Sequence, residues 1–221
     1  MQIAFLGGTG DIGEGLALRI ARDTDHDVLI GSRKAEKAQA AADEYEATLD
    51  DRGVDAAVEG LENPEAAARA DVAVAAVPAY HLSDTLDAVA DELGDAVLVS
   101  PAVGMQRDED GLHYNPPGIG SVTQLAAASA PDDVPVVGAF HNLAAGKLAD
   151  LDAELDWDVP IVSDDDEAKA QIVELTEEVE TLRPLDAGGL ANAAEVESVT
   201  PLLINLAANN DDLHDLGVKF W

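Results

Sequence analysis

The glycine-rich stretch GGTGDIG, at residues 7–13, limits the possible folds of this chain more than any other feature. It follows the short apolar run at residues 3–6 and precedes a helical pattern of apolar residues. The spacing Gly8-x-Gly10-x-x-Gly13 suits a tight turn from a strand into a helix, where the backbone can approach a phosphate group. The N-terminus of that helix presents free N–H groups to the same anion. This segment therefore predicts a strand, a turn and a helix that together bind the pyrophosphate of a dinucleotide.

A cluster of cations after the second predicted strand indicates which dinucleotide binds. NAD-binding folds place an Asp or Glu at this point, against the 2′-hydroxyl of the ribose. This chain instead has a hydroxyl and three cations, Ser32, Arg33, Lys34 and Lys37. Arg and Lys side chains suit an additional 2′-phosphate, so the sequence predicts NADP. A solvated helix start is the alternative, but the whole chain has only 12 Lys and Arg residues, so this local concentration favours phosphate binding.

The formal net charge of −33 limits the possible partners. Nucleic acids and anionic membrane surfaces would be repelled by such a chain, so we expect neither as a partner. The 47% hydrophobic content and the regular apolar strands favour a folded protein over an acidic disordered one. The acids are spread over the chain and Lys is scarce. We therefore interpret this as the sequence of a halophile's protein, because molar salt in the cytosol would screen the repulsion between carboxylates. The alternative is an acidic protein from an ordinary cytosol with a cationic partner.

The absence of cysteine removes disulfides, thiol nucleophiles and zinc–thiolate sites from consideration. The chain has no signal-like N-terminal segment and no apolar run of membrane-spanning length, so a cytoplasmic location is expected. The acidic run at residues 164–167 opens a predicted helix, where carboxylates interact favourably with the helix dipole. We therefore expect no metal site there.

Alternating strands and helices predict the fold class. Strands are expected at residues 3–6, 27–31, 55–60, 71–77, 96–100 and 134–139, with helices at 34–50, 63–69 and 83–92. The run at 71–77 is apolar throughout, which is typical of a strand buried on both faces of a parallel sheet. We therefore expect an α/β fold in which residues 1–142 form a Rossmann-like, doubly wound, mostly parallel sheet that binds NADP. The loop after the fourth strand should cross the ligand crevice, which makes Val77, Ala79 and Ser83 candidate cofactor-binding residues.

The pattern changes after residue 142. A short helix at 143–150, a strand at 158–162 and helices at 167–181 and 190–209 predict a small C-terminal α+β cap domain, residues 143–221. We expect it to cover the ligand site.

Several motifs resemble those of one enzyme family along nearly the whole chain. They include Gly7-Gly8-Thr9-Gly10, Gly31-Ser32-Arg33, Val99-Ser100-Pro101, Trp157-Asp158-Val159-Pro160, Leu182-Arg183-Pro184-Leu185, Val196-Glu197-Ser198-x-Thr200-Pro201 and Gly217-x-Lys219-Phe220. On these residues the chain resembles the NADPH-dependent reductases of the 8-hydroxy-5-deazaflavin coenzyme F420, which are found mainly in archaea. The resemblance implies a homodimer that transfers hydride reversibly and directly between NADP(H) and coenzyme F420, with the deazaflavin ring under the cap.

The resemblance also implies roles for individual residues. The pyrophosphate would contact Thr9, Gly10, Asp11 and Ile12, and the 2′-phosphate would contact Ser32, Arg33 and Lys37. The stacked rings would lie near His141, Leu143 and Ser198, while Val103 and Ala145 would border the nicotinamide. The catalytic candidates are Thr9, His141 and Ser198, which could stabilise charge on the deazaflavin.

Two other functions remain open at this stage. An NADP-dependent reductase of a small imine or ketone would use the same first domain but would need a catalytic acid. A non-enzymatic redox sensor would bind NADP and change its association with a partner without turnover.

Overall fold

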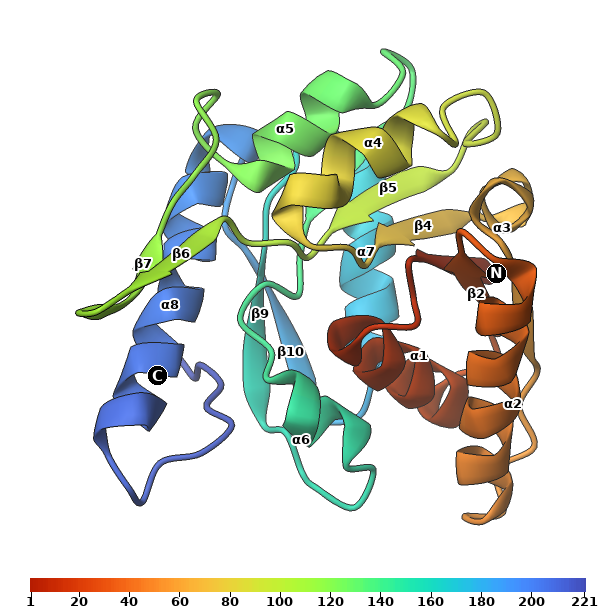
Figure 1. The fold of residues 1–221 in the computed structure, drawn as a ribbon, viewed down its shortest axis with the longest axis horizontal. Helices are drawn as coiled ribbons and strands as arrows, with labels where there is room; N and C mark the ends of the chain where they lie inside the picture. The colour runs from red at the N-terminus through yellow and green to blue at the C-terminus, as the bar shows by residue number, and fades with distance from the viewer.

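Six parallel strands form the central sheet, in the order β3-β2-β1-β4-β5-β8 (Figure 1). The computed structural model describes residues 1–221. The strands are β1 (Gln2–Leu6), β2 (Asp27–Ser32), β3 (Val58–Glu62), β4 (Val72–Ala75), β5 (Val97–Ser100) and β8 (Val136–Gly138). Every neighbouring pair is parallel, which confirms the predicted Rossmann-like sheet. The strand order reverses between β1 and β4, and this is where folds of this kind bind their ligands.

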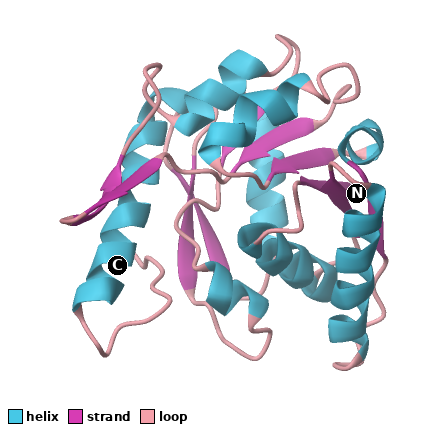
Figure 2. Ribbon diagram, in the orientation of Figure 1, coloured by secondary structure: helices cyan, strands magenta, loops and turns pink.

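Helices cover both faces of the sheet (Figure 2). One face packs against α1 (Asp11–Asp23), α2 (Ala35–Asp50) and α7 (Asp166–Glu178), and the other against α3 (Asn63–Arg69), α4 (Leu82–Asp87) and α5 (Val122–Ser129). Successive side chains of β1 point to opposite faces of the sheet, which explains the two layers. Phe5 shares a core with Leu16 of α1, whereas Leu6 shares the other core with Leu82 of α4. The doubly wound arrangement is confirmed. None of the helices has both the length and the apolar character needed to cross a membrane.

The C-terminal part of the chain adds residues to the core that contains Phe5, and its last helix stands apart from that core. Its elements are α6 (Ala145–Ala149), β9 (Trp157–Ile161), α7, β10 (Leu182–Asp186), the 3₁₀ turn η2 (Leu190–Asn192) and α8 (Ala193–Asn209). β9 and β10 form a parallel pair, and Val162 extends this pair to β8 through antiparallel bonds of 2.8 and 3.0 Å with Gly138. Leu148 and Trp157 belong to the same core as Phe5. The core is therefore continuous across the domain boundary expected after residue 142.

A hairpin that the sequence analysis does not predict supports α8. It consists of β6 (Met105–Asp108) and β7 (Gly111–Tyr114), paired antiparallel. The Asn205 side chain on α8 accepts from Leu112 N at 3.1 Å and donates to Leu112 O at 2.6 Å, as an additional strand residue would. Helix α8 and the hairpin lie side by side, away from α1 and α2 (Figure 1). Helix α5 and strand β10 are also absent from the sequence-based expectation.

A buried arginine joins α1 to α6. Arg19 is 1% exposed, and its guanidinium donates to the carbonyls of Lys147, Leu148, Asp150 and Ala153 at distances from 2.6 to 3.1 Å. Carbonyls at the end of a helix have no partner within the helix, so this side chain supplies one. Gly15 permits the close approach, because a Cβ there would lie 2.5 Å from the Cβ of Leu148. Arg19 thereby fixes α6, which begins at the predicted site residue Ala145.

Candidate active site

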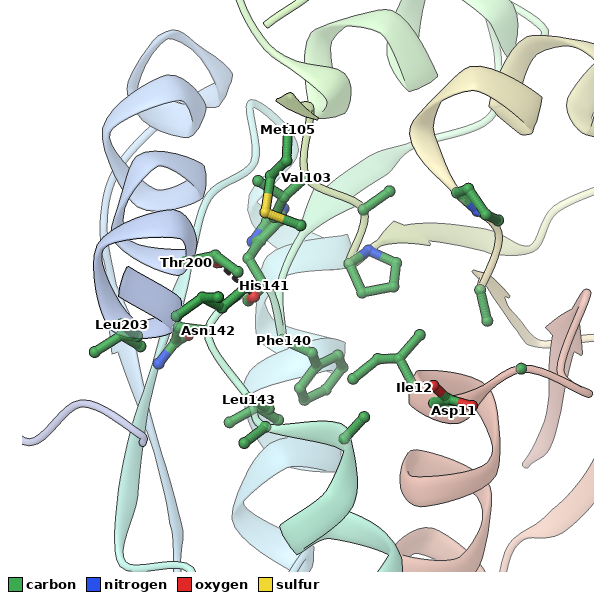
Figure 3. Close-up of a pocket in the computed structure, with 18 of the residues that line it drawn as sticks. Asp11, Ile12, Val103, Met105, Phe140, His141, Asn142, Leu143, Thr200 and Leu203 are labelled. Atoms are coloured by element: carbon green, nitrogen blue, oxygen red, sulfur yellow. Dashed lines mark hydrogen bonds between the residues drawn. The ribbon is translucent and has the colours of Figure 1, made fainter. Parts of the chain in front are cut away.

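A cavity of about 790 Å³ opens at the carboxyl ends of the parallel strands (Figure 3). Its lining comes from the segments that follow β1, β4, β5 and β8, together with α8 and the C-terminal tail. Asp11 and Ile12 lie at one end, Thr200 and Leu203 of α8 lie at the other, and His141 lies between them (Figure 3). Fifteen of the 23 lining residues are hydrophobic. The cavity therefore joins the glycine-rich turn to the predicted cap and suits flat, largely apolar groups.

The glycine-rich turn has the geometry that a pyrophosphate requires. A Cβ on Gly13 would lie 2.7 Å from Gly8 Cα, so the helix can approach the turn only if this residue is glycine. A Cβ on Gly10 would meet only a carbonyl oxygen 4.0 Å away, which leaves open space beside the backbone. The first backbone bond of α1 runs from Glu14 N to Gly10 O at 2.9 Å. The N–H groups of residues 9–13, unlike those of Gly7 and Gly8, are free to bind an anion, so these residues fit the dinucleotide.

Two side chains hold the turn in place. The Tyr45 hydroxyl on α2 donates to Gly8 O at 3.1 Å, and Asn63 Oδ1 accepts from Gly7 N at 3.2 Å. Burial raises the pKa of Tyr45, so its hydroxyl remains protonated as a donor. The sequence predicts neither residue, because their connection to the turn depends on long-range packing.

The predicted 2′-phosphate cluster lies at the end of β2. Ser32 is buried, whereas Arg33, Lys34 and Lys37 are exposed at the start of α2. None of the three cations takes part in an ion pair. Six other cations are paired with carboxylates, namely Arg22, Arg52, Arg69, Lys169, Arg183 and Lys219. In a chain with 45 acids, three unpaired cations at this position provide a local site for an anion.

His141 lies in the cavity wall as a neutral side chain. It is 4% exposed, and burial lowers its pKa to about 3. Its Nε2 lies 3.2 Å from Thr123 Oγ1, and its Nδ1 has no partner. The preceding residue, Phe140, has a φ of 66°, a left-handed conformation that is uncommon for a bulky residue and often occurs at functional sites. Because the imidazole is neutral, His141 can act near pH 7 through hydrogen bonds but cannot act as a cationic acid.

The face of helix α8 that lines the cavity is not the face that carries Ser198, the residue expected from the sequence. Its lining residues are Thr200, Leu203, Ile204 and Ala207. Ser198 does not line the cavity, and its hydroxyl donates to Glu195 O at 2.8 Å on the same helix. Two residues along a helix correspond to a rotation of about 200°, so Ser198 and Thr200 point in nearly opposite directions. The helical repeat from Thr200 could have identified this face.

The structure brings together nine of the predicted site residues at the cavity. They are Gly10, Asp11, Ile12, Val77, Ala79, Val103, His141, Leu143 and Ala145. Thr9 is in the turn beside Gly10 but does not line the cavity, and the 2′-phosphate cluster is likewise outside it. Ser83 contacts the hydroxyl of Ser129 on α5 at 3.0 Å and does not line the cavity. The cavity lining also contains residues that the sequence does not predict, from the hairpin, a loop and the C-terminal tail, namely Met105, Phe140, Asn142, Asp215 and Leu216.

A buried carboxylate anchors the tail that completes the cavity wall. Asp158 is fully buried in β9 and accepts from Arg183 Nε at 2.7 Å, Arg183 Nη2 at 2.6 Å and Phe220 N at 2.6 Å. Lys219 Nζ also lies 3.5 Å from it. The hydrogen bonds from Arg183, with that from Phe220 N, lower the pKa of Asp158 to about 2. The same tail carries Leu216 into the cavity lining.

We expect Asp158→Asn to loosen the tail and lower the free energy of unfolding, because the amide cannot accept all of these bonds. Since the folded-state pKa of Asp158 is depressed, its stabilisation is complete above the unfolded pKa of about 3.9 and disappears as the pH falls toward about 2. The difference in stability between wild type and Asp158→Asn should therefore narrow over that range. Urea titrations at a series of pH values measure it. A difference that stays constant from about pH 5 to about pH 2 would contradict this account.

The sequence comparisons with known proteins agree on one enzyme family. Residues 2–104 match the sequence model of the family described as NADP oxidoreductase, coenzyme F420-dependent. The F420-dependent NADP reductase of Methanocaldococcus jannaschii is 37% identical over 209 residues, which cover 93% of this chain and 92% of that protein. The enzyme of the same name from Methanothermobacter thermautotrophicus is 40% identical over 214 residues, covering 95% of this chain and 90% of that protein.

Solved structures show the same fold. A protein of Arthrobacter sp. FB24 superimposes with a TM-score of 0.82 at 24% identity and covers 100% of this chain and 99% of its own. A pyrroline-5-carboxylate reductase from Coxiella burnetii has a TM-score of 0.60 at 17% identity, covering 92% of this chain and 66% of that one. At these identities the structural likeness supports the fold alone.

Proposed function

Because the chain belongs to the family of coenzyme F420-dependent NADP oxidoreductases, we infer that it transfers hydride reversibly between NADP(H) and coenzyme F420. It is an oxidoreductase whose two substrates are these coenzymes. One structural observation supports this most directly, namely the single apolar cavity that extends from the glycine-rich turn to α8. Such a cavity can hold a nicotinamide from one side and a second ring from the other.

We propose that NADP occupies the sheet side of the cavity. The free N–H groups near Gly10 and Asp11 would bind the pyrophosphate, with Thr9 and Ile12 as their neighbours in the turn. The cluster of Ser32, Arg33 and Lys37 would bind the 2′-phosphate. Val77 and Ala79 would border the cofactor where it crosses from β1 to β4, and Val103 and Ala145 would border the nicotinamide.

The deazaflavin ring is proposed to lie between the nicotinamide and α8, against His141, Leu143 and Thr200. A deazaflavin has a carbon at its reactive position, so it exchanges a hydride directly with nicotinamide. The chain's task is then to hold the reacting carbons about 3–3.5 Å apart and to exclude water with its apolar wall. Neutral His141 can act there only as a fixed dipole and hydrogen-bonding group. Ser198 would contribute indirectly, through the shape of α8.

The titratable side chains of the cavity favour this function over reduction of a small imine or ketone. The only ones in its lining are Asp11, His141 and Asp215. Asp11 is exposed in the phosphate-binding turn, Asp215 is exposed in the tail, and His141 is neutral. None of them is a buried acid suited to protonate a small substrate, as that alternative would require.

The experiment that tests this function mixes the purified protein at molar KCl with NADPH and oxidised coenzyme F420. We expect the visible absorbance of the deazaflavin to disappear as NADPH is consumed in equal amount, and to return when NADP is added to the reduced coenzyme. Pyrroline-5-carboxylate serves as the comparison acceptor. NADPH oxidation with the imine alone would support the reductase alternative, and binding of NADPH without turnover would support a redox sensor.

We propose that the enzyme is a homodimer and that it works in the cytoplasm of a halophilic archaeon. Leu202 and Leu206 lie one turn apart on the same face of α8 and are 56% and 41% exposed, and this apolar pair suits burial against a second copy. The opposite face of the same helix, with Thr200, Leu203 and Ile204, lines the cavity, so a partner on the outer face would support the wall of the ring site. The charge of −33 supports a salt-rich cell and disfavours nucleic acid and anionic membranes as partners.

A further inference from the structure

Helix α8 carries a fully buried carboxylate that has no cationic partner. Glu197 is 0% exposed and receives four hydrogen bonds. Its Oε1 accepts from Thr123 N at 2.9 Å and from Thr123 Oγ1 at 3.0 Å, and its Oε2 accepts from Val122 N at 3.0 Å and from the Tyr114 hydroxyl at 2.9 Å. The two backbone donors belong to the first turn of α5, where a carboxylate is favoured by the helix dipole. Both carboxylate oxygens are therefore occupied by donors, and Glu197 acts only as an acceptor.

The directions of these bonds determine the protonation of His141. The single proton of the Thr123 hydroxyl is committed to Glu197 Oε1, so the hydroxyl oxygen can only accept from His141 Nε2. Nε2 must then carry the proton. A neutral imidazole has one N–H, which leaves Nδ1 as an unprotonated acceptor. This Nδ1 is buried and has no partner in the protein, an arrangement that a bound donor would relieve.

We propose that Glu197 is a positioning residue, which acts through Thr123 to fix the Nε2–H tautomer of His141 and so offers Nδ1 as an acceptor to an N–H group of a bound ring. The proposal rests on the proposed function, because it takes the ring from one of the two coenzymes. Both rings have such a donor, in the imide of the deazaflavin pyrimidine and in the carboxamide of the nicotinamide. The low pKa of His141 supports the proposal, since a neutral ring keeps Nδ1 unprotonated at physiological pH.

Three substitutions separate this role from a merely structural one. Thr123→Val keeps the shape of the side chain but removes the hydroxyl that links Glu197 to His141. Thr123→Ser keeps that hydroxyl and should restore wild-type behaviour. Tyr114→Phe removes a different bond to Glu197, the 2.9 Å bond from the hairpin, and serves as the control for general weakening of the carboxylate site. These variants avoid Glu197→Gln, whose amide would place a donor against a backbone N–H and could prevent folding.

The first measurement is the tautomer of His141, read from the ¹⁵N NMR signals of the imidazole in the ligand-free protein at molar KCl. The chain has five histidines, and the signals of His141 are those absent from His141→Asn. We expect the Nε2–H form from about pH 8 to about pH 5 in wild type, Thr123→Ser and Tyr114→Phe. Thr123→Val should show a mixture of tautomers. An Nδ1–H form in wild type, or an unchanged Nε2–H form in Thr123→Val, would overturn the proposal.

The second measurement is steady-state hydride transfer. Thr123→Val should lower kcat/KM about tenfold, which corresponds to one hydrogen bond, and Thr123→Ser should stay within about twofold of wild type. A loss confined to coenzyme F420 would identify the imide as the donor, and a weaker NADP affinity would identify the carboxamide. A wild-type protein with the expected tautomer but no hydride transfer would contradict the proposed function and leave the tautomer result intact.

Discussion

Replacing Arg33 and Lys37 together by alanine is expected to remove about 2–4 kcal/mol of the preference for NADP over NAD. Charge-assisted hydrogen bonds to a phosphate contribute about 1.5–3 kcal/mol each, and neighbouring contacts are not additive. The loss should fall on NADP alone, because NAD has no group at the 2′ position that reaches these cations. Dissociation constants of both nucleotides, measured by calorimetry at one salt concentration, test this expectation.

A matched control separates local binding from overall charge. Arg52→Ala with Arg69→Ala removes the same two charges from partly exposed side chains that are each paired with a carboxylate, Asp152 and Glu59 respectively. This control should leave the ratio of the two affinities nearly unchanged. Equal affinities for NADP and NAD in the wild-type protein would exclude the proposed role of the Ser32, Arg33 and Lys37 cluster.

The folded state is expected to require high salt. With a net charge of −33, carboxylates repel one another over a Debye length of about 10 Å at 0.1 M salt, which shortens to about 3 Å at 1 M. On transfer from molar KCl to below about 0.1 M, we expect dissociation of the proposed dimer first and loss of the fold afterwards. Light scattering measures the mass, and circular dichroism measures the Tm at each KCl concentration.

Sucrose provides the control, because it favours compact states without screening charge. If screening is the cause, sucrose at low salt should raise the Tm much less than KCl does. A Tm and a mass that do not change with KCl would contradict the halophilic interpretation.

The sequence is sufficient to predict the central sheet because its strands carry strong local signals. The apolar run that forms β4 (Val72–Ala75) and the glycine-rich turn after β1 each identify their element without reference to the rest of the chain. The hairpin β6–β7 lacks such a signal. Its first strand, Met105–Asp108, is exposed along its whole length and is held by pairing with β7, which in turn bonds to Asn205 of α8. Such tertiary support cannot be read from local periodicity.

The candidate site likewise contains residues that the sequence predicts and features that depend on tertiary packing. The residues in the turn after β1 follow from the glycine spacing, and His141 and Leu143 follow from the family resemblance. The burial that makes His141 neutral depends on packing, as does the link from Glu197 through Thr123, which joins residues 74 positions apart. The expectation for Ser198 names the correct helix, but the residues that line the cavity lie on the face of Thr200.

The most direct test of hydride transfer between the two coenzymes uses NADPH with deuterium at the transferable nicotinamide position. The protein, at molar KCl, reduces coenzyme F420 in ordinary water, and mass spectrometry and NMR locate the label. Because the two rings are proposed to stack in one apolar cavity, the deuterium should appear on the reactive carbon of the deazaflavin without exchange with solvent. Loss of the label to water, or no reaction with both coenzymes at saturation, would contradict the account.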